Sequence, residues 1–485
     1  MKHSETDKSN KHRGYVTVFI SLILVVMIGV VIVVLEVCDR NHARIKMSTA
    51  LSSAMSSELA SYNRYVFDRY HILTLDVNRS SGTGGMEQSI SDTLKTDLGK
   101  GYEIEEIVIS KKKSLLDDEC SEFKRQIKDN FKYDLADNVA EKIMDKTNGN
   151  DKPVDETTVQ NIDSDINERQ AEISENADSS EDDEDEGSDD EDNVTDPRET
   201  LKTYTDAGIH LLLLPKEVEL KESKLDLNEL PSGGFEPGDS MEVDTSFSDK
   251  DRMEMDGLKS GGWSSGFTDK AGSLSYASSY FNLLTEKKYD DTVLNLEMEY
   301  LVAGRSTDGA NYKTVVNELL LIRFGFNFGY IVTDSIKMGE CETLAAALTV
   351  EFPVLEPVVK YLLAGCWSYI ESVADVYRLL RNHKVPYLKD ETNWLTDFES
   401  LAHLEEICNG EKEDEEGVGY KDYLLILAFL QGDKLEKRML DLIQINTKKN
   451  SDPSFLIRNC ITAFAVDADI DYKGRRYSYH EEIGY

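Results

Sequence analysis

The sequence is poor in the motifs that build catalytic and metal sites. Its six cysteines stand far apart without a CxxC pair, which excludes the common zinc and redox-active dithiol motifs. None of the eight histidines belongs to an HExxH motif, and the chain lacks a Walker phosphate loop and a GxSxG elbow. We predict no catalytic residue, no cofactor and no metal site. We expect that the protein is not an enzyme, although a catalytic group assembled from distant residues stays open.

Positive charge is also scarce, because 54 basic side chains face 93 acidic ones and the net charge is −39. Residues 151–200 concentrate 21 acidic side chains against 3 basic ones. Such a surface repels nucleic-acid phosphates, so we expect no nucleic-acid partner. The acidic run at 179–192 lacks the ligand spacing of a calcium loop. High charge with few apolar groups predicts a disordered acidic linker over residues 148–200.

One long apolar run stands out against this acidic background. Tyr15–Cys38 holds 24 residues with a single charged side chain, Glu36. A helix of that length reaches roughly 36 Å and spans a ~30 Å hydrocarbon core. A cleaved signal peptide normally has a shorter apolar region of about 7–15 residues. A lipoprotein site would need a small residue before Cys38, and Val37 is not small. We therefore predict a single transmembrane helix and a partner in the lipid bilayer.

The charges that flank this run barely discriminate between the two orientations in the membrane. The basic residues are Lys2, Lys8, Lys11 and Arg13 before it, and Arg40, Arg44 and Lys46 after it. A short tail followed by a large body fits a single-pass protein of the cell membrane with its body outside the cytoplasm. The opposite orientation remains open.

The helix is predicted to continue beyond the apolar run with a narrow apolar face. The residues that recur at three- and four-residue intervals are Ala43, Met47, Ala50, Leu51, Ala54, Met55 and Leu59. This face would pack against other helices or against the protein's own domain, and the pattern does not separate the two. Glu36 is the candidate helix-packing charge, since a charge at the membrane boundary can pair with a partner's charge.

The N-terminus resembles the pilin-like minor pseudopilins of tight-adherence (Tad) pilus systems. The resemblance rests on "RGYVTVFISLILVV", on Leu35-Glu36 and on the Ala/Ser-rich continuation beyond Arg40. In that family a glycine precedes the prepilin-peptidase cleavage point, and a glutamate usually follows five residues later. Gly14 and Tyr15 form the matching candidate cleavage site, whereas Phe19 stands where the glutamate is expected. The resemblance implies pilus or secretion-system proteins as partners.

The rest of the chain resembles an uncharacterised family of membrane-anchored proteins from Gram-positive anaerobes, a domain of unknown function. The stretches that carry this resemblance include "LNLEMEYLVAGRSTDGANYKTVVNELLLIRFGFNF", "CWSYIESVADVYRLLRNHKVPYLK" and "DYLLILAFL". They cover most of residues 292–430. The resemblance implies a membrane location and supplies no catalytic residue.

The predicted fold class is α+β. A transmembrane helix continues into a long helix, and an extracytoplasmic body follows, with a helical bundle-like part and antiparallel strands, interrupted by the acidic linker. We divide the chain into a short tail (1–14), a transmembrane helix (15–38), a long helix with a small α/β region (39–147), the disordered linker (148–200), a mixed loop-rich segment (201–291) and an α+β domain (292–485).

Periodicity predicts the elements of the body. Predicted strands lie at 69–77, 102–109 and 292–302, and the chain closes with a hairpin that begins at 460. Predicted helices lie at 115–147, 312–331, 355–380, 419–431 and 433–448. In the hairpin, Asp467, Asp469 and Asp471 fall on one face and predict an acidic outer surface of a strand.

Two carboxylates lie four residues apart on the helix predicted over 355–380. Glu371 and Asp375 would share one face, and paired carboxylates can serve acid–base chemistry. A surface or ion-pair role is the favoured interpretation.

These observations favour a structural or assembly component of the envelope linked to a Tad-like pilus or secretion system. The alternative is a membrane-anchored extracytoplasmic binding protein without a pilus role. A tethered enzyme is the third possibility. The N-terminal residue of the mature protein discriminates the first two, because prepilin-type processing would leave Tyr15 at the N-terminus.

Overall fold

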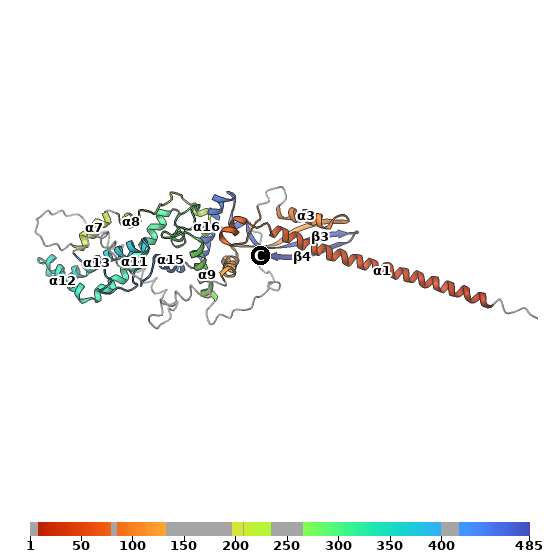
Figure 1. The fold of residues 1–485 in the computed structure, drawn as a ribbon, viewed down its shortest axis with the longest axis horizontal. Helices are drawn as coiled ribbons and strands as arrows, with labels where there is room; N and C mark the ends of the chain where they lie inside the picture. Colours follow the sequence, from red (N-terminus) through yellow and green to blue (C-terminus); the bar gives the residue numbers. More distant parts are fainter. Residues whose placement is uncertain (1–7, 79–84, 132–195, 207, 234–264, 399–416) are drawn as a thin grey trace, which may run out of the picture. The chain divides into compact units, whose positions relative to one another are not determined.

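The computed structural model describes residues 8–78, 85–131, 196–206, 208–233, 265–398 and 417–485, and it is an α+β fold (Figure 1). The chain forms two compact units, which are treated separately below. Unit 1 takes its described residues from Met1–Glu122 and Ser454–Tyr485, and unit 2 from Phe123–Phe235 and Lys259–Pro453. The predicted acidic linker lies outside the described residues up to position 195, and helix α7 begins at Pro197.

Unit 1 begins with α1, a single helix of 52 residues over Lys8–Leu59. Its segment from Tyr15 to Cys38 is exposed on every side, and the helix is long and apolar enough to cross a membrane. The remainder of α1 changes character, because every third or fourth residue from Ala43 to Leu59 is buried. One continuous helix therefore has two parts, which we call the bare half (Tyr15–Cys38, apolar and exposed) and the packed half (Ala43–Leu59, buried along one face).

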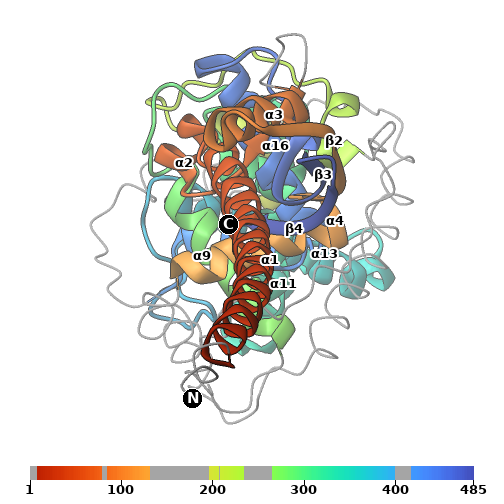
Figure 2. The ribbon, with the colours of Figure 1, turned by 90° about the vertical axis from the view of Figure 1, so that its right-hand side faces the viewer.

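An antiparallel sheet lies alongside the packed half of α1 (Figure 2). Its strands are β1 (Leu75–Asp76), β2 (Tyr102–Ser114), β3 (Cys460–Tyr472) and β4 (Arg476–Gly484), and β3 pairs with each of the others. Lys473 and Gly474 both have positive φ between β3 and β4, as a two-residue type I′ hairpin turn requires. The predicted C-terminal hairpin is therefore confirmed, and β3 is also the central strand of the sheet.

The core of unit 1 joins α1, α3 (Gly85–Leu98) and one face of the sheet. From β3 it takes Phe464, Val466, Ala468 and Ile470, which alternate with the predicted acidic outer face. The apolar face of α1 is buried against these residues and against Ile90 and Leu94 of α3. Of the two packing interpretations, burial on the protein's own domain is the one observed.

The remaining elements are mostly helical. Besides α1 and α3, unit 1 contains α2 (Arg64–Tyr70) and the 3-10 turn η5 (Ile457–Asn459), and α4 (Asp117–Phe131) runs across the boundary between the units. Unit 2 contains α7 (Pro197–Asp206), α8 (Ile209–Leu213), η1 (Leu227–Glu229), η2 (Pro231–Gly233), α9 (Ser265–Tyr280), α10 (Glu297–Ala303), α11 (Asp308–Thr333), α12 (Ser335–Leu348), η4 (Pro353–Leu355), α13 (Glu356–Leu380), α15 (Tyr420–Phe429) and α16 (Lys434–Asn450). The predicted helices over 312–331, 355–380, 419–431 and 433–448 are confirmed within a few residues.

Two strand predictions fail for physical reasons. The strand predicted over 69–77 is reduced to β1, because the first two of these residues belong to α2. Asn63 caps α2 by accepting a hydrogen bond from the Val66 amide. The strand predicted over 292–302 is a loop followed by α10.

Glu297 and Glu299 alternate with apolar residues in this stretch, as on the polar side of a strand, but both are fully buried. Glu297 accepts from the Asn282 amide at 2.9 Å, and Glu299 accepts from the Leu284 amide at 2.9 Å. Tyr420 also donates its hydroxyl to Glu299 at 2.7 Å. The two acids satisfy the loop that precedes α10, so tertiary hydrogen bonds override the alternating pattern.

The predicted domain over 292–485 is divided between the two units. Residues from Ser454 onward belong to unit 1, because β3 forms its hydrogen-bonded ladder with β2 over Tyr102–Ser114. The described cysteines are free thiols, at 38, 120, 341, 366 and 460.

Candidate functional site

The candidate cleavage residues lie near the start of α1. Gly14 and Tyr15 are both inside the helix, and Tyr15 is 77% exposed. The side chains that follow on the apolar segment are exposed as well. The site is therefore part of the bare half of α1.

Glu36, the candidate helix-packing charge, forms an ion pair with Arg40 one turn later in the same helix. Both side chains are about half exposed. Three residues beyond Glu36, Asp39 accepts a 2.6 Å hydrogen bond from Lys473 in the hairpin turn, and this bond lowers the pKa of Asp39. Charged side chains thus mark the border between the bare and the packed halves of α1.

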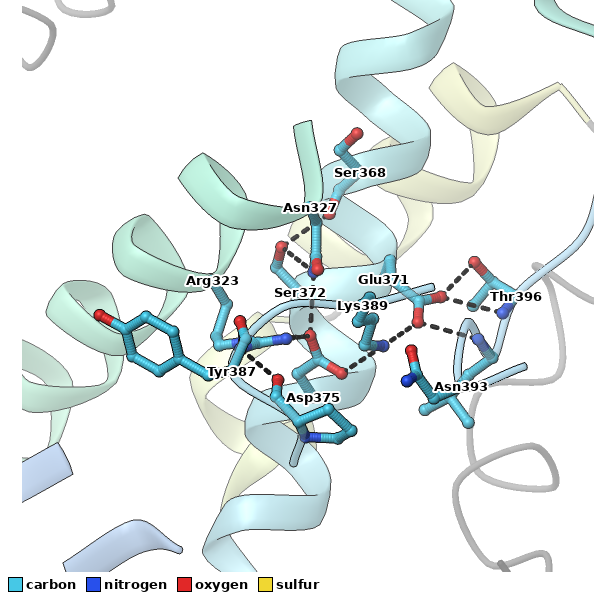
Figure 3. Close-up of polar contacts among 12 residues, drawn as sticks. Arg323, Asn327, Ser368, Glu371, Ser372, Asp375, Tyr387, Lys389, Asn393 and Thr396 are labelled. Carbon is cyan, nitrogen blue, oxygen red and sulfur yellow. Dashed lines mark hydrogen bonds and ion pairs between the residues drawn. The ribbon is translucent and has the colours of Figure 1, made fainter. Parts of the chain in front are cut away.

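A second candidate site is a buried network of charges in unit 2 (Figure 3). Glu371 and Asp375 share one face of α13, as their spacing predicts, and both are completely buried. Arg323 reaches Asp375 from α11, and Lys389 reaches both acids from the segment that follows α13. The interpretation as an ion pair is confirmed, and a surface position for these acids is wrong.

Asp375 stands between the two cations. Its Oδ2 atom lies 2.9 Å from Nε of Arg323, and its Oδ1 atom lies 2.6 Å from Nζ of Lys389. Lys389 also forms an ion pair with Glu371. Two cations and two carboxylates therefore balance inside the unit, with side chains that are 0–1% exposed.

Arg323 uses its remaining donors to hold the chain after α13. Its Nη1 donates to the carbonyl oxygens of Pro386 and Tyr387 at 2.9 and 3.1 Å, and to the Tyr423 hydroxyl at 3.1 Å. One guanidinium thus contacts α13, α15 and the intervening segment, a use for which its planar set of five donors is suited.

Glu371 holds the same segment further along. Its carboxylate accepts from the amides of Leu395 and Thr396 at 2.9 Å, and from the Thr396 hydroxyl at 2.6 Å. The Trp367 indole donates to that hydroxyl oxygen at 2.9 Å. Within α11 and α13, Asn327 completes the network by donating to Asp375 at 2.9 Å. We call Arg323, Asn327, Glu371, Asp375 and Lys389 the buried charge network.

The network favours the charged form of Asp375. Burial alone would raise the pKa of Asp375, but Lys389 and Arg323 outweigh it and hold that pKa below its usual value. A carboxylate locked as an anion between two cations is a poor proton carrier. The geometry is that of a clamp, which ties residues 386–396 to α11 and α13.

The described residues hold no group of three or more His, Cys, Asp or Glu side chains arranged to bind a metal ion. A pocket of about 350 Å³ in unit 2 is lined in part by Leu225, Leu230, Lys448 and Lys449, and by no member of the network. The network is therefore not the wall of this cavity.

Sequence reasoning missed Arg323, Asn327 and Lys389. The available signal was a charged residue inside an otherwise apolar helix, which usually marks burial with a partner. α11 is itself long and apolar enough to cross a membrane, but 39% of its most apolar stretch is buried inside the protein. Because Arg323 in α11 pairs with α13, the position of α11 is explained as a core helix of unit 2.

These features define an α+β protein whose N-terminal helix is long and apolar enough to span a membrane. Residues 187–472 match the model of a family of unknown function, DUF5702, and the chain belongs to that family. The match includes the whole buried charge network and all of β3. No curated protein and no solved structure matches the chain.

Proposed function

We propose that this protein is a single-pass membrane protein of the cell envelope that acts as a structural or assembly component of a Tad-like pilus or secretion system. The observation that carries the proposal is the division of α1. Its apolar residues from Tyr15 to Cys38 are exposed, whereas every third or fourth residue from Ala43 to Leu59 is buried in the core of unit 1.

The exposed apolar side chains of this helix must be shielded from water. At roughly 25 cal/mol per Å² of apolar surface, leaving about 20 apolar side chains in water would cost tens of kcal/mol. A bilayer supplies that cover, and so does a bundle of similar helices. An assembly subunit uses the two in turn, leaving the membrane when its helix packs against those of partner proteins.

The packed half of α1 suits this role, because it ties the apolar segment rigidly to a folded body. Glu36 and Arg40 neutralise each other at the border, so the helix can sit in the bilayer without an unpaired charge. On assembly, we propose, Glu36 exchanges Arg40 for a cation of a partner helix.

The proposal is tested by crosslinking and co-purification of the full chain with the pilus machinery encoded in the same cell. Glu36→Leu and Gly14→Leu should reduce co-purification while membrane insertion stays intact, and Val26→Leu is the matched control. An N-terminus at Tyr15 in the mature protein supports prepilin-type processing. If both variants co-purify as the unaltered protein does, the assembly role is refuted.

The pocket in unit 2 favours a second candidate function, an anchored extracytoplasmic binding protein. It combines apolar residues with three lysines and two carboxylates, a mixed set of charges that fits a small polar ligand; these charged residues are Lys224, Asp226, Glu229, Lys448 and Lys449. An intact N-terminus at Met1, with a body that proteases reach from outside the cell, would support this alternative.

A further inference from the structure

A large apolar surface lies where α12 turns into α13 in unit 2. Val354 is 89% exposed, Val350 74%, Val358 67% and Phe352 66%. Four further residues, Leu348, Leu355, Tyr361 and Leu362, are between 45 and 56% exposed. These eight residues, named here the hairpin patch, come from a stretch of only 15 residues.

The size of the hairpin patch is unusual for a surface without a partner. The exposed fractions correspond to roughly 900 Å², against about 300–600 Å² for the largest apolar patch of a typical monomer. One side of a standard protein interface contributes about 800 Å². The hairpin patch alone is therefore large enough for one side of a stable interface.

The part of the hairpin patch on α13 forms a stripe. Val358, Tyr361 and Leu362 follow helical spacing and lie on the face opposite the buried Leu363 and Trp367. Leu355 precedes them as the last residue of η4. The stripe itself carries no charge. The nearby Lys360 is only partly exposed and pairs with Glu342 of α12 at 2.6 Å, so it is occupied within the chain.

The order of apolar residues along the η4–α13 segment is the same in both directions from Val358. Leu355 of η4 and Tyr361 of α13 stand three residues to either side, and Val354 of η4 and Leu362 of α13 stand four residues to either side. Two copies of this segment that cross antiparallel at Val358 therefore bring each apolar residue against an apolar counterpart. A two-fold interface requires this self-complementarity, because both partners present the same surface.

We propose that the hairpin patch is a homotypic interface, at which a second copy of this chain packs its η4–α13 segment antiparallel against the first about Val358. An uncharged stripe offers nothing to a charged peptide. A bilayer with anionic headgroups is disfavoured by the net charge of −39. The inference is independent of any pilus role.

Disulfide crosslinking in membranes from cells that produce the full chain tests the interface. Cys38, Cys366 and Cys408 are replaced by Ser, and Val358→Cys is introduced at the two-fold axis. Oxidation should give a covalent dimer. Lys384→Cys, an exposed residue of the same unit outside the hairpin patch, is the matched control and should stay monomeric. Absence of a dimer at position 358, or an equal yield at 384, overturns the proposal.

A second measurement counts copies of the full chain in lipid nanodiscs. Val354→Asp together with Val358→Asp should convert dimers to monomers without unfolding, because both residues are exposed. Raising the salt concentration should strengthen the dimer by screening repulsion between two acidic copies. A monomer in nanodiscs at all salt concentrations overturns the proposal. The proposal is also overturned if the Val358→Cys variant is monomeric and its new thiol does not react with thiol reagents. In that case a bilayer or the chain itself covers the hairpin patch.

Discussion

Replacing Lys389 by Met tests whether the buried charge network holds unit 2 together. The change removes one cation and keeps most of the aliphatic volume. Asp375 would retain Arg323, but Glu371 would keep only the amide and hydroxyl donors of Leu395 and Thr396. Removing one partner of a buried ion pair typically costs about 3–5 kcal/mol, because the remaining charge is uncompensated. We expect a loss of about 3 kcal/mol at pH 7, since those remaining donors offset part of the penalty.

Tryptophan fluorescence during urea unfolding of the full chain in detergent provides the assay. Nζ of Lys389 lies 5.7 Å from the ring centroid of Trp394, and Trp367 donates to Thr396 inside the clamp. The two indoles therefore report on this part of unit 2. Lys384→Met is the matched control, because Lys384 is exposed in the same segment and should change stability by less than about 0.5 kcal/mol.

The double variant Lys389→Met with Glu371→Gln separates charge from packing. Neutralising Glu371 removes the uncompensated anion, so the double variant should be more stable than Lys389→Met alone. If Lys389→Met is as stable as the Lys384→Met control, the reasoning about the buried charge network is refuted. It is also refuted if Glu371→Gln lowers the free energy of unfolding of the Lys389→Met variant by as much as it lowers that of the unaltered protein.

Three further changes probe other parts of the structure. Gly304→Ala should destabilise unit 2 by about 1–3 kcal/mol in thermal unfolding, because Gly304 has φ of +62° and a Cβ there would lie 2.5 Å from Nη2 of Arg438; an unchanged midpoint would contradict this. Leu51→Ala should cost about 2–5 kcal/mol and raise the protease sensitivity of unit 1, whereas Val26→Ala, on the bare half of α1, should leave the folded body unchanged. Burial raises the pKa of Glu299 to about 7, so the folded state binds that proton more tightly than the unfolded state. Stability should therefore fall as the pH rises from about 4.5 to about 7, and Glu299→Gln should flatten this dependence in unfolding curves measured across that range.

Elements that carry their own periodicity were predictable from the sequence. α1 and α13 are long and patterned, and the hairpin of β3 and β4 carries its alternation and its Lys473-Gly474 turn locally. The strand predicted over 292–302 failed although its alternation is just as regular. Its acidic residues serve amides of a preceding loop, and no local pattern encodes that use.

In the candidate site, too, contacts between residues close in sequence were predictable and contacts between residues far apart in sequence were not. Glu371 and Asp375 share a face through helical geometry alone, so their proximity was predictable. Their cations were not, because Arg323 is 52 residues before Asp375 and Lys389 is 18 residues after Glu371. The pairing of β2 with β3 joins segments that are separated by most of the chain, which a periodic pattern cannot reveal.

Unit 1 is built from two segments that are far apart in the sequence, and this has a consequence for its folding during synthesis. β2 ends at Ser114 and its partner β3 begins at Cys460, so about 350 residues are translated between the two strands. At about 5–20 residues per second this interval lasts on the order of half a minute. During that time α1 can already occupy the membrane while the apolar face beyond Ala43 has no sheet to cover it. Unit 2 can fold within the interval, and unit 1 closes only after β3 has emerged, so a chain that stalls inside unit 2 exposes this face to proteases and chaperones.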